Sequence, residues 1–439
     1  MEKFHLTPDL AIVGAGPVGC LTALSFAHRG AQVLLLEANP AGADRLAGEW
    51  LHPPAVQILE RLGVNVPASG GHNTGAGYVV FPDDRSEPIV LKYPEGLKGI
   101  SCEHKHLVLA LREAVVSQPS IQFISSVRAT RIEGKKLTFR NEDQDLAKTV
   151  TAGQIVGADG RASWVRRQLG DPNHSVTVSL MAGILLENAE LPYEGFGHVV
   201  LGGPGPVLIF RISPRYLRIC LDVPAHRHSV KEASAYLWNA YGPVLPSALL
   251  PAFQDALQKR PILWAANQFR SRFYYGENGI PLVGDAVGHF HPLTAVGLTL
   301  GFMDGDCLAR SSCFEDYRKE RSALSYVPEL LAYSLYRVFT NQDAGSVALR
   351  KSVYRTWREN PFERQRTMRL LAGLETDPSQ FRKAFLKMMR SAMSGALKTY
   401  QWRSMIGAFG GFMEWFQWLR ANAAELRQSA NAHDGKKCL

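Results

Sequence analysis

A strand–helix–strand pattern opens the chain. Residues 9–13 form a short apolar run, residues 18–29 carry a helical pattern, and residues 32–36 form a second apolar run. Short apolar runs on either side of a helix are typical of parallel strands joined by a crossover helix. We therefore predict a parallel βαβ-like unit over about the first 70 residues.

Further along, strand and helix patterns are interleaved. Leucines four residues apart predict a helix over residues 105–116. Strands are predicted over 77–81, 89–93, 121–132 and 135–140, followed by a strand-rich region over 176–223. Residues 233–259 are mostly helical, and from about residue 315 the pattern is helical nearly to the end. The expected fold class is α/β (α+β), with strands of a second sheet interrupting the first unit.

Three glycines follow the first predicted strand at the spacing of a dinucleotide-binding turn. Gly14 permits the tight turn, Gly16 lets the backbone approach a pyrophosphate, and Gly19 lets the helix pack on the strand. The positive N-terminus of that helix then faces the phosphates. Glu37 ends the second strand, where it can accept hydrogen bonds from an adenosine ribose. The alternative is an ordinary glycine-rich turn beside a surface glutamate.

A second glycine-rich block occupies residues 279–309. A hydrophobic strand over 281–283 ends in a Gly-Asp pair, and a helical segment follows. The marker residues of this block are Gly284, Asp285, Pro292, Gly297, Gly301, Asp304 and Asp306. Taken with the N-terminal turn, the block suggests a flavin dinucleotide. Its pyrophosphate would lie at one end of the chain, and its ribityl arm would be bound at the other.

A third block, Gly157 to Arg166, lies between these two. Its Asp159-Gly160 turn and the Ser163 hydroxyl can cap the helix that follows. A purely structural turn is therefore a fair interpretation of this block alone. Its place between the two other blocks favours a role near the cofactor.

Composition sets the broad class. The 439 residues are 46% hydrophobic and 20% charged, as in an ordinary globular protein with two or three domains. The six cysteines include no CxxC pair, which indicates a reduced, intracellular protein without a metal site. The first strand begins so early that we expect no signal peptide or N-terminal anchor.

The positive charge lies in the C-terminal quarter. Residues 331–439 hold 18 Lys and Arg against 8 Asp and Glu, whereas the rest of the chain is nearly neutral. Within this quarter, residues 404–419 read SMIGAFGGFMEWFQWL, with large apolar residues at spacings of three and four. This stretch is too short for a confident membrane span, but it suits an amphipathic helix at an anionic lipid surface. The alternative is a helix packed on its own domain. Nucleic acid is not an expected partner, because no recognition motif accompanies the charge.

The order of the three blocks resembles that of flavoprotein monooxygenases of the aromatic-hydroxylase type. Those proteins share the order GxGxxG, GADGxxSxxR and GDAxxxxxPxxxxG. The resemblance implies a Rossmann-like FAD-binding domain. It also implies that Asp285 binds the ribityl hydroxyls, and that Asp159 and Gly160 lie near the flavin and the path of a nicotinamide.

Several stretches are more narrowly similar to squalene monooxygenase (squalene epoxidase). Residues 44–53 (DRLAGEWLHP) resemble its DRIVGE-x-LQPGG segment, and residues 284–299 resemble its GDAxxxRHPLTGGGMT segment. Residues 197–224 resemble its PSPxLxYQIS…RxLVDI strand pair, and 331–339 and 349–354 its C-terminal helices. The chain departs from that pattern at several positions. His52 replaces a Gln, Ala295-Val296-Gly297 replace three glycines, Leu298 replaces a Met, and His106 replaces an Arg that contacts flavin.

The resemblance implies a set of site residues. In the family a Gly-Tyr tyrosine hydrogen-bonds the Gln, so the corresponding pair here would be Tyr78 and His52, near the reacting face. The implied cofactor-binding residues are Gly14, Ala15, Gly16, Pro17, Val18, Gly19, Glu37, Ala38, Arg45, Trp50, His106, Val127, Asp159, Gly284, Asp285, Pro292, Gly297 and Leu298.

The implied activity is insertion of one oxygen atom of dioxygen into a lipophilic polyprenyl, polyene or alkyl-chain substrate. Reduced flavin supplies the chemistry, so few catalytic side chains are needed. The electron source is NAD(P)H or a partner reductase. The alternatives are a flavin oxidase, desaturase or prenyl-chain reductase, and a non-catalytic flavin- or lipid-binding protein. A halogenase is disfavoured, since no WxWxIP segment is present.

We expect a cytoplasmic protein with peripheral attachment to a membrane. The FAD-binding domain would consist of residues 1–75, 101–175 and 271–330, and the substrate domain of 76–100 and 176–270. Residues 331–425 would be helical and membrane-associated, and residues 426–439 a disordered tail.

Overall fold

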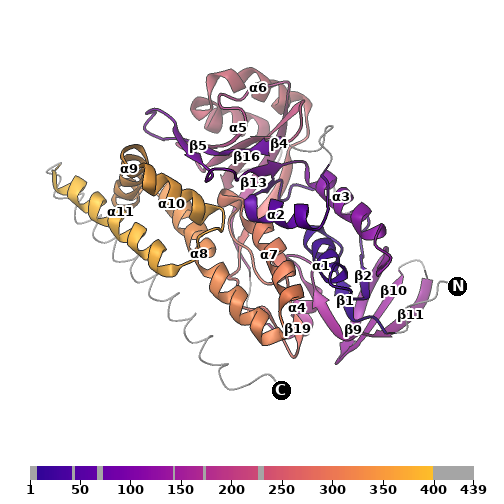
Figure 1. The fold of residues 1–439 in the computed structure, drawn as a ribbon. Helices are drawn as coiled ribbons and strands as arrows, with labels where there is room; N and C mark the ends of the chain where they lie inside the picture. Colours follow the sequence, from indigo (N-terminus) through magenta and orange to yellow (C-terminus); the bar gives the residue numbers. More distant parts are fainter. Residues whose placement is uncertain are drawn as a thin grey trace.

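The computed structural model describes residues 7–41, 45–66, 73–141, 144–171, 175–225 and 232–398. The predicted amphipathic stretch over 404–419 and the predicted tail over 426–439 lie outside the described residues. Figure 1 shows the chain coloured along its sequence, with the N-terminal elements at one end of the molecule and the helices α9 and α11 at the other.

A parallel four-stranded sheet forms around the first strand. Its order is β12 (Gln154–Gly157), β1 (Leu10–Val13), β2 (Val33–Leu36) and β8 (Ile121–Ile124). The helices α1 (Pro17–Ala27) and α3 (His104–Val116) pack together beside it. All four residues of β1 and of β2 are buried, as expected for strands covered on both faces. The predicted strand–helix–strand unit is therefore confirmed.

The predicted strand over 121–132 is two strands. β8 ends at Ile124, and β9 (Val127–Glu133) begins after Ser126, which has a φ of 58°. That conformation interrupts an extended chain. β9 then pairs with β10 (Lys136–Asn141), which in turn pairs with β11 (Gln144–Thr151). The apolar pattern missed β11, because this outer strand is largely polar.

A seven-stranded sheet forms the second layer. Its order is β17 (Leu263–Phe269), β13 (Val176–Glu187), β16 (Tyr216–Pro224), β15 (Val207–Arg211), β14 (Phe196–Val200), β5 (Gly77–Phe81) and β6 (Ile89–Lys92). Strands β5 and β6 come from between the elements of the parallel sheet, so the two sheets are interleaved along the chain. A third, small sheet has the order β3 (Trp50–Leu51), β7 (Gly99–Ser101) and β4 (Asn73–Gly75). Its strands lie before β5 and after β6 in the sequence.

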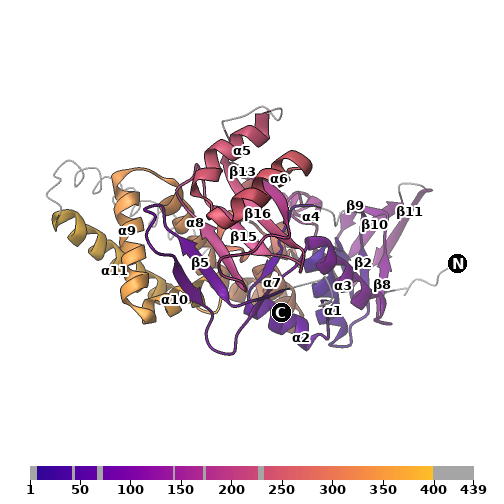
Figure 2. The same cartoon turned by 90° about the horizontal axis from the view of Figure 1, so that it is seen from above.

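Different helices cover the two faces of the seven-stranded sheet. Ile209 and Ile219 face a core with α5 (Ala233–Tyr241) and α6 (Leu250–Lys259). Phe210 and Cys220, one residue along, face the core built with the C-terminal helices, as the period-two alternation of strands requires. These helices are α8 (Phe314–Thr340), α9 (Ala344–Glu359), α10 (Pro361–Leu371) and α11 (Pro378–Lys398). Figure 2 shows the sheet between the two groups. The expected domain boundary at residue 330 falls inside α8.

Helix α7 (Gly297–Arg310) lies against α1 through glycines one turn apart. A Cβ atom on Gly301 would lie 2.6 Å from Val18 Cγ2, and one on Gly305 would lie 2.3 Å from Thr22 Oγ1. Only glycine permits this approach. The packing brings the two glycine-rich blocks of the sequence together, although they lie more than 250 residues apart.

The remaining elements are short. They are the helices α2 (Pro53–Arg61) and α4 (Trp164–Gln168), the strands β18 (Gly276–Glu277) and β19 (Ile280–Pro281), and single 3-10 turns, among them those at Gly284–Ala286 and Pro292–Thr294. The predicted strand at 281–283 is thus shifted toward the N-terminus. Among the helices that the structure describes, none has the length and apolar character to cross a membrane.

Candidate flavin site

The N-terminal glycine turn has the shape that a pyrophosphate requires. Gly14 has a φ of 105°, and a Cβ atom there would lie 2.6 Å from the carbonyl oxygen of Ala158. Gly16 precedes α1 and supplies no side-chain cap, and no atom lies within 4 Å of where its Cβ would be. The N-terminus of α1 therefore faces open space, and such a helix end attracts anions. The geometry fits the phosphates of FAD.

Glu37 fixes this turn from the end of β2. Its Oε2 atom accepts a hydrogen bond from the Ala15 amide at 2.8 Å, and its Oε1 atom accepts one from the Asn39 amide at 2.7 Å. A carboxylate has further lone pairs, so Glu37 can still accept hydrogen bonds from a ribose. The amide of Val127 donates to the Glu37 carbonyl at 2.9 Å. Ala38, next along the chain, is partly buried.

Arg112 is a site residue that sequence reasoning missed. From α3 its Nε atom donates to the Ala15 carbonyl at 3.2 Å, and its Nη2 atom lies 3.5 Å from Glu37 Oε2. Nothing in the helical pattern distinguishes this arginine, since its partners lie more than 70 residues away in sequence.

The Gly-Asp turn is held rigidly by a buried ion-pair cluster. Gly284 has a φ of 65°, and its amide donates to Asp304 Oδ2 at 2.9 Å. Asp304 is fully buried and pairs with Arg272 and Arg321. Two cations and a backbone amide thus compensate the buried carboxylate.

Asp285 itself is partly exposed and pairs with a different arginine. Its Oδ2 atom lies 3.1 Å from Arg161 Nε. Burial acts to raise the pKa of Asp285, but the hydrogen bond from Arg161 and the charges of Arg161, His289 and Arg272 together outweigh it and lower the pKa below its usual value. Asp285 is therefore an anionic acceptor at neutral pH, as ribityl hydroxyls require.

Asp159 has a different role in the described structure. Its Oδ1 atom accepts from the Ser163 hydroxyl at 2.5 Å, and its Oδ2 atom accepts from the amides of Trp164 and Val165 at 2.6 and 3.0 Å. The Ser163 hydroxyl accepts from the Arg166 amide, which confirms the predicted cap. Burial raises the pKa of Asp159. Both oxygens are engaged with α4, so the geometry favours the structural interpretation of this turn.

Backbone and side-chain contacts shape the turn before α7. Pro292 begins a 3-10 turn, and Ala295 adopts a left-handed φ of 51°. The next helix begins at Gly297, where no atom lies within 4 Å of the position that a Cβ atom would take. Leu298 packs on Gly48, whose Cβ would lie 3.1 Å from the leucine Cδ2. This second helix N-terminus is therefore also open.

His52 and Tyr78 do not form the predicted hydrogen-bonded pair. The rings of His52 and Tyr78 have centroids 5.9 Å apart, but the hydroxyl at 2.7 Å from His52 Nδ1 belongs to Tyr93. The buried Tyr78 hydroxyl has no hydrogen-bond partner among the described residues. The prediction of a Tyr78–His52 hydrogen bond is wrong, because the two tyrosine rings are almost equally far from the imidazole but only the Tyr93 hydroxyl is directed at Nδ1.

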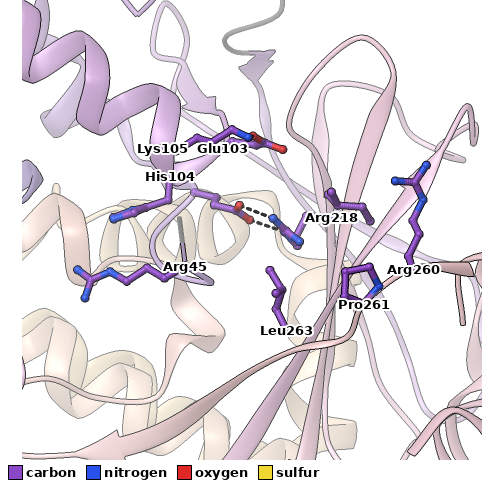
Figure 3. Close-up of a pocket in the computed structure, with 10 residues that line it drawn as sticks. Arg45, Glu103, His104, Lys105, Arg218, Arg260, Pro261 and Leu263 are labelled. Carbon is purple, nitrogen blue, oxygen red and sulfur yellow. Dashed lines mark hydrogen bonds and ion pairs between the residues drawn. The ribbon is translucent and has the colours of Figure 1, made fainter. Parts of the chain in front are cut away.

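A pocket of about 250 Å³ lies between the start of α3 and the seven-stranded sheet (Figure 3). Its lining residues are Arg45, Glu49, Glu103, His104, Lys105, Leu185, Arg218, Arg260, Pro261 and Leu263. Glu49 and Arg218 are buried and form a bidentate ion pair. Arg218 Nε and Nη2 each lie 2.9 Å from a carboxylate oxygen of Glu49. The Arg218 Nη1 atom is buried without a partner among the described residues. Arg45 lines the same space, where a guanidinium can pair with phosphate or hydrogen-bond a flavin ring.

The expected arginine position on α3 is not part of that pocket. His106 lies near the start of α3, partly buried, with its Nδ1 atom 4.0 Å from Glu103 Oε2. Its neighbours His104 and Lys105 line the pocket instead. Burial lowers the pKa of His104 to about 4, so His104 is neutral at physiological pH.

Most of the predicted cofactor residues therefore gather in two places. One group surrounds the N-terminus of α1, and the other surrounds the N-terminus of α7. Val18 joins them, because its side chain lies 3.0 Å from the Cβ position of Gly284. Trp50 lies two residues before His52, whose amide donates to Thr299 of α7 at 3.0 Å, and the Trp50 ring lies 5.0 Å from that of Tyr78.

Arg45 lines the separate pocket, and His106 has no contact with either group among the described interactions. The backbone of Asp159 lies beside the first group, since a Cβ atom on Gly14 would lie 2.9 Å from its Cα, but its carboxylate is engaged with α4.

The fold and these paired turns are those of FAD-dependent oxidoreductases. The family model for FAD dependent oxidoreductases matches residues 9–66. The chain is structurally similar to the flavin-dependent brominase Bmp2, with a TM-score of 0.69, 17% identity, and coverage of 88% of this chain and 99% of the other. It is also similar to pqsL, a probable FAD-dependent monooxygenase from Pseudomonas aeruginosa, with a TM-score of 0.61, 16% identity, and coverage of 82% and 99%.

The sequence comparisons identify the family. The squalene epoxidase model matches residues 151–409, which is more than half of the chain. Squalene epoxidase erg1 of Aspergillus fumigatus is 28% identical over 80% of this chain and 79% of its own length. Squalene monooxygenase of Mus musculus is 26% identical over 80% of this chain and 65% of its own length. The chain belongs to the squalene epoxidase family, and it is an FAD-dependent monooxygenase.

Proposed function

We propose that this enzyme inserts one oxygen atom of dioxygen into an alkene of a lipophilic polyprenyl substrate, with squalene as the first candidate. The observation that carries the proposal is the meeting of two open helix N-termini, those of α1 and α7, beside an apolar cluster. That arrangement can hold a flavin while its reacting side faces hydrocarbon. The names of the relatives supply the substrate candidate.

The cofactor residues divide into three roles in this proposal. The turn from Gly14 to Gly19 binds the pyrophosphate, and Glu37 binds the adenosine ribose. Asp285 accepts hydrogen bonds from the ribityl hydroxyls, with Gly284 shaping its turn. The backbone from Pro292 to Leu298, at the positive end of α7, would hold the flavin ring system. Arg45 binds the flavin from the side of the pocket. A bound reduced flavin activates dioxygen, and the protein residues orient the reactants and exclude water.

The substrate side is apolar and aromatic. Trp50, Tyr78 and Phe210 belong to one buried cluster with residues of α8 to α11, among them Leu330 and Met368. Such a surface binds a hydrocarbon chain by excluding water rather than by charge. The unpartnered Tyr78 hydroxyl is the polar group here, and we assign it to orienting the substrate or the reacting oxygen. His52 has a positioning role.

The direct test uses the purified FAD-bound protein, a reductant and ¹⁸O₂. Squalene, a shorter polyprenyl alkene and a saturated alkane of equal length are supplied in detergent or vesicles, and products are analysed by mass spectrometry. The proposal predicts one ¹⁸O atom in the product of an alkene and none in the alkane. A desaturated or reduced product without ¹⁸O would establish the alternative oxidase or reductase activity. If every alkene is left unchanged and dioxygen is reduced only to hydrogen peroxide, the proposed substrate class is contradicted.

The electron source can be separated in the same assay. NADPH alone and NADPH with a flavoprotein reductase are compared at equal reducing capacity. In the proposal the electrons come from NAD(P)H or from a partner reductase, because the single dinucleotide turn of the GxGxxG type serves the FAD and leaves both routes open. Full turnover with NADPH alone would show that this enzyme is reduced directly.

We also propose peripheral attachment to anionic membranes through the C-terminal quarter. Deletion of residues 404–439 removes the Trp-rich stretch and should move the protein from the vesicle pellet to the supernatant. Sedimentation with vesicles containing phosphatidylserine measures this shift, and vesicles of phosphatidylcholine alone are the control. Unchanged sedimentation after the deletion would contradict the assignment of this segment.

A further inference from the structure

Four groups form a continuous hydrogen-bonded chain that ends at the turn before α7. Trp50 Nε1 lies 3.0 Å from the Tyr93 hydroxyl, and that hydroxyl lies 2.7 Å from His52 Nδ1. On the other side of the imidazole, His52 Nε2 lies 2.9 Å from the carbonyl oxygen of Thr294. Trp50, Tyr93, His52 and Thr294 are all buried.

The chemistry of the two ends fixes the direction of every proton in this chain. An indole N–H can only donate, so the Tyr93 oxygen accepts from Trp50. The Tyr93 proton is then free to be donated to His52 Nδ1, which must carry a lone pair. A carbonyl oxygen can only accept, so His52 Nε2 must carry the proton that reaches Thr294. The neutral form of His52 is therefore the tautomer protonated at Nε2. Burial lowers its pKa to about 4, which agrees with the neutral ring.

The hydrogen-bonded chain ends at a backbone segment under conformational constraint. Thr294 closes the 3-10 turn, and Ala295 follows with its left-handed φ of 51°. A non-glycine residue keeps that conformation only where its surroundings hold it. Thr294 is buried, and the imidazole of His52 supplies a hydrogen bond to its carbonyl oxygen. The His52 amide also donates to Thr299 Oγ1 at 3.0 Å, so one residue contacts both sides of the turn.

We propose that Tyr93 and Trp50 are positioning residues that act through His52 on the turn from Thr294 to Gly297. They fix the orientation and tautomer of the imidazole, and the imidazole holds the backbone that begins α7. The relevance of this turn to catalysis rests on the proposed function, in which the turn faces the flavin. The hydrogen-bond chain itself does not depend on the cofactor.

Residue 52 permits a matched pair of variants. A glutamine has an acceptor oxygen for the Tyr93 hydroxyl and a donor nitrogen for the Thr294 carbonyl, so His52→Gln can keep both hydrogen bonds. Glutamine is also the residue that the squalene monooxygenase pattern has at this position. His52→Leu keeps a similar volume and loses both bonds. The turnover rate should fall by about tenfold or more in His52→Leu and by much less in His52→Gln, since a buried carbonyl loses its partner only in the former.

The decisive readout is the nitrogen spectrum of His52 in the FAD-bound protein labelled with ¹⁵N-histidine. The His52→Gln spectrum identifies the His52 signals by their loss. We expect a neutral ring at pH 7, with a protonated Nε2 and a hydrogen-bonded, unprotonated Nδ1. In Tyr93→Phe the Nδ1 chemical shift should move to the value of an unprotonated nitrogen that accepts no hydrogen bond. Tyr78→Phe is the matched control for this shift, because the Tyr78 hydroxyl bonds nothing among the described residues.

A double-mutant comparison separates positioning from bulk packing. If Tyr93 acts through His52, Tyr93→Phe should slow turnover in the wild-type and His52→Gln backgrounds but add little to His52→Leu. Additive effects in all backgrounds, or a proton on Nδ1 at pH 7, would overturn the proposal. An FAD-bound protein that shows the expected spectrum yet oxygenates no alkene would refute the proposed function and leave the hydrogen-bond chain intact.

Discussion

Two turns of this protein, Asp159-Gly160 and Gly284-Asp285, look alike in sequence and differ in structure. Asp159 follows β12 and Asp285 follows the strand β19, each beside a glycine with positive φ. Asp159 directs both oxygens at α4, whereas Asp285 pairs with the side chain of Arg161 and remains partly exposed. The comparison teaches that a motif aspartate is a candidate ligand only when its hydrogen bonds are not already used inside the fold.

Replacing Asp285 should have the largest effect on the cofactor. Asp285→Ala removes the anionic acceptor proposed for the ribityl arm, and a hydrogen bond to a charged group is worth about 1.5–3 kcal/mol. We expect the dissociation constant for FAD to rise about 10- to 100-fold, with a matching loss of activity. Flavin retained per protein after gel filtration measures this. The surface variant Asp255→Ala is the control, since Asp255 pairs only with exposed Lys259 among the described contacts.

Replacing Asp159 should instead weaken the fold. Asp159→Ala removes the acceptor for the amides that begin α4, and a lost cap costs about 0.5–2 kcal/mol. We expect Tm to fall by a few degrees, while the folded variant still binds FAD with nearly the wild-type affinity. Ser163→Ala tests the same cap from its other side. A loss of FAD affinity as large as that in Asp285→Ala, with Tm unchanged, would reverse the two assignments.

Replacing Arg161 should change the pH dependence more than the affinity at neutral pH. Arg161 lowers the pKa of Asp285, so the carboxylate contributes its stabilisation above the unfolded pKa and loses it as the pH falls through the lower folded pKa. In Arg161→Gln less positive charge opposes the effect of burial on Asp285, so the pKa of Asp285 rises. FAD binding should then weaken at a higher pH on acidification, with a change of about twofold to fivefold near neutrality. Titrations between about pH 4 and pH 7 would detect this. Parallel pH profiles for both proteins would contradict it.

The sequence was sufficient to predict the elements that carry glycine signals. Gly14, Gly16 and Gly19 mark a turn whose geometry follows from local conformation, and the strand–helix–strand unit around them was found. Gly301 is a marker of the same kind, and the close contact of α1 with α7 explains it. The polar strand β11 and the break at Ser126 were not predicted, because neither changes the apolar periodicity enough to be seen.

The contacts of the site were harder to predict than its location. Tyr93 and His52 lie 41 residues apart, and their hydrogen bond depends on how the end of β6 packs over β3. A motif match pointed to Tyr78, one strand away. Arg112 and the Glu49–Arg218 pair likewise depend on tertiary packing and have no local signature. The helix cap around Asp159, in contrast, could be predicted from Ser163 and its spacing.

The central claim is that FAD is held jointly by the turns at Gly14–Gly19 and Gly284–Leu298. A crystal structure of the FAD complex tests it most directly. We expect the pyrophosphate at the N-terminus of α1, the ribityl hydroxyls within hydrogen-bond distance of Asp285, and the ring beside the N-terminus of α7. A complex in which the ribityl arm contacts Asp159 while Asp285 contacts only protein would contradict the account.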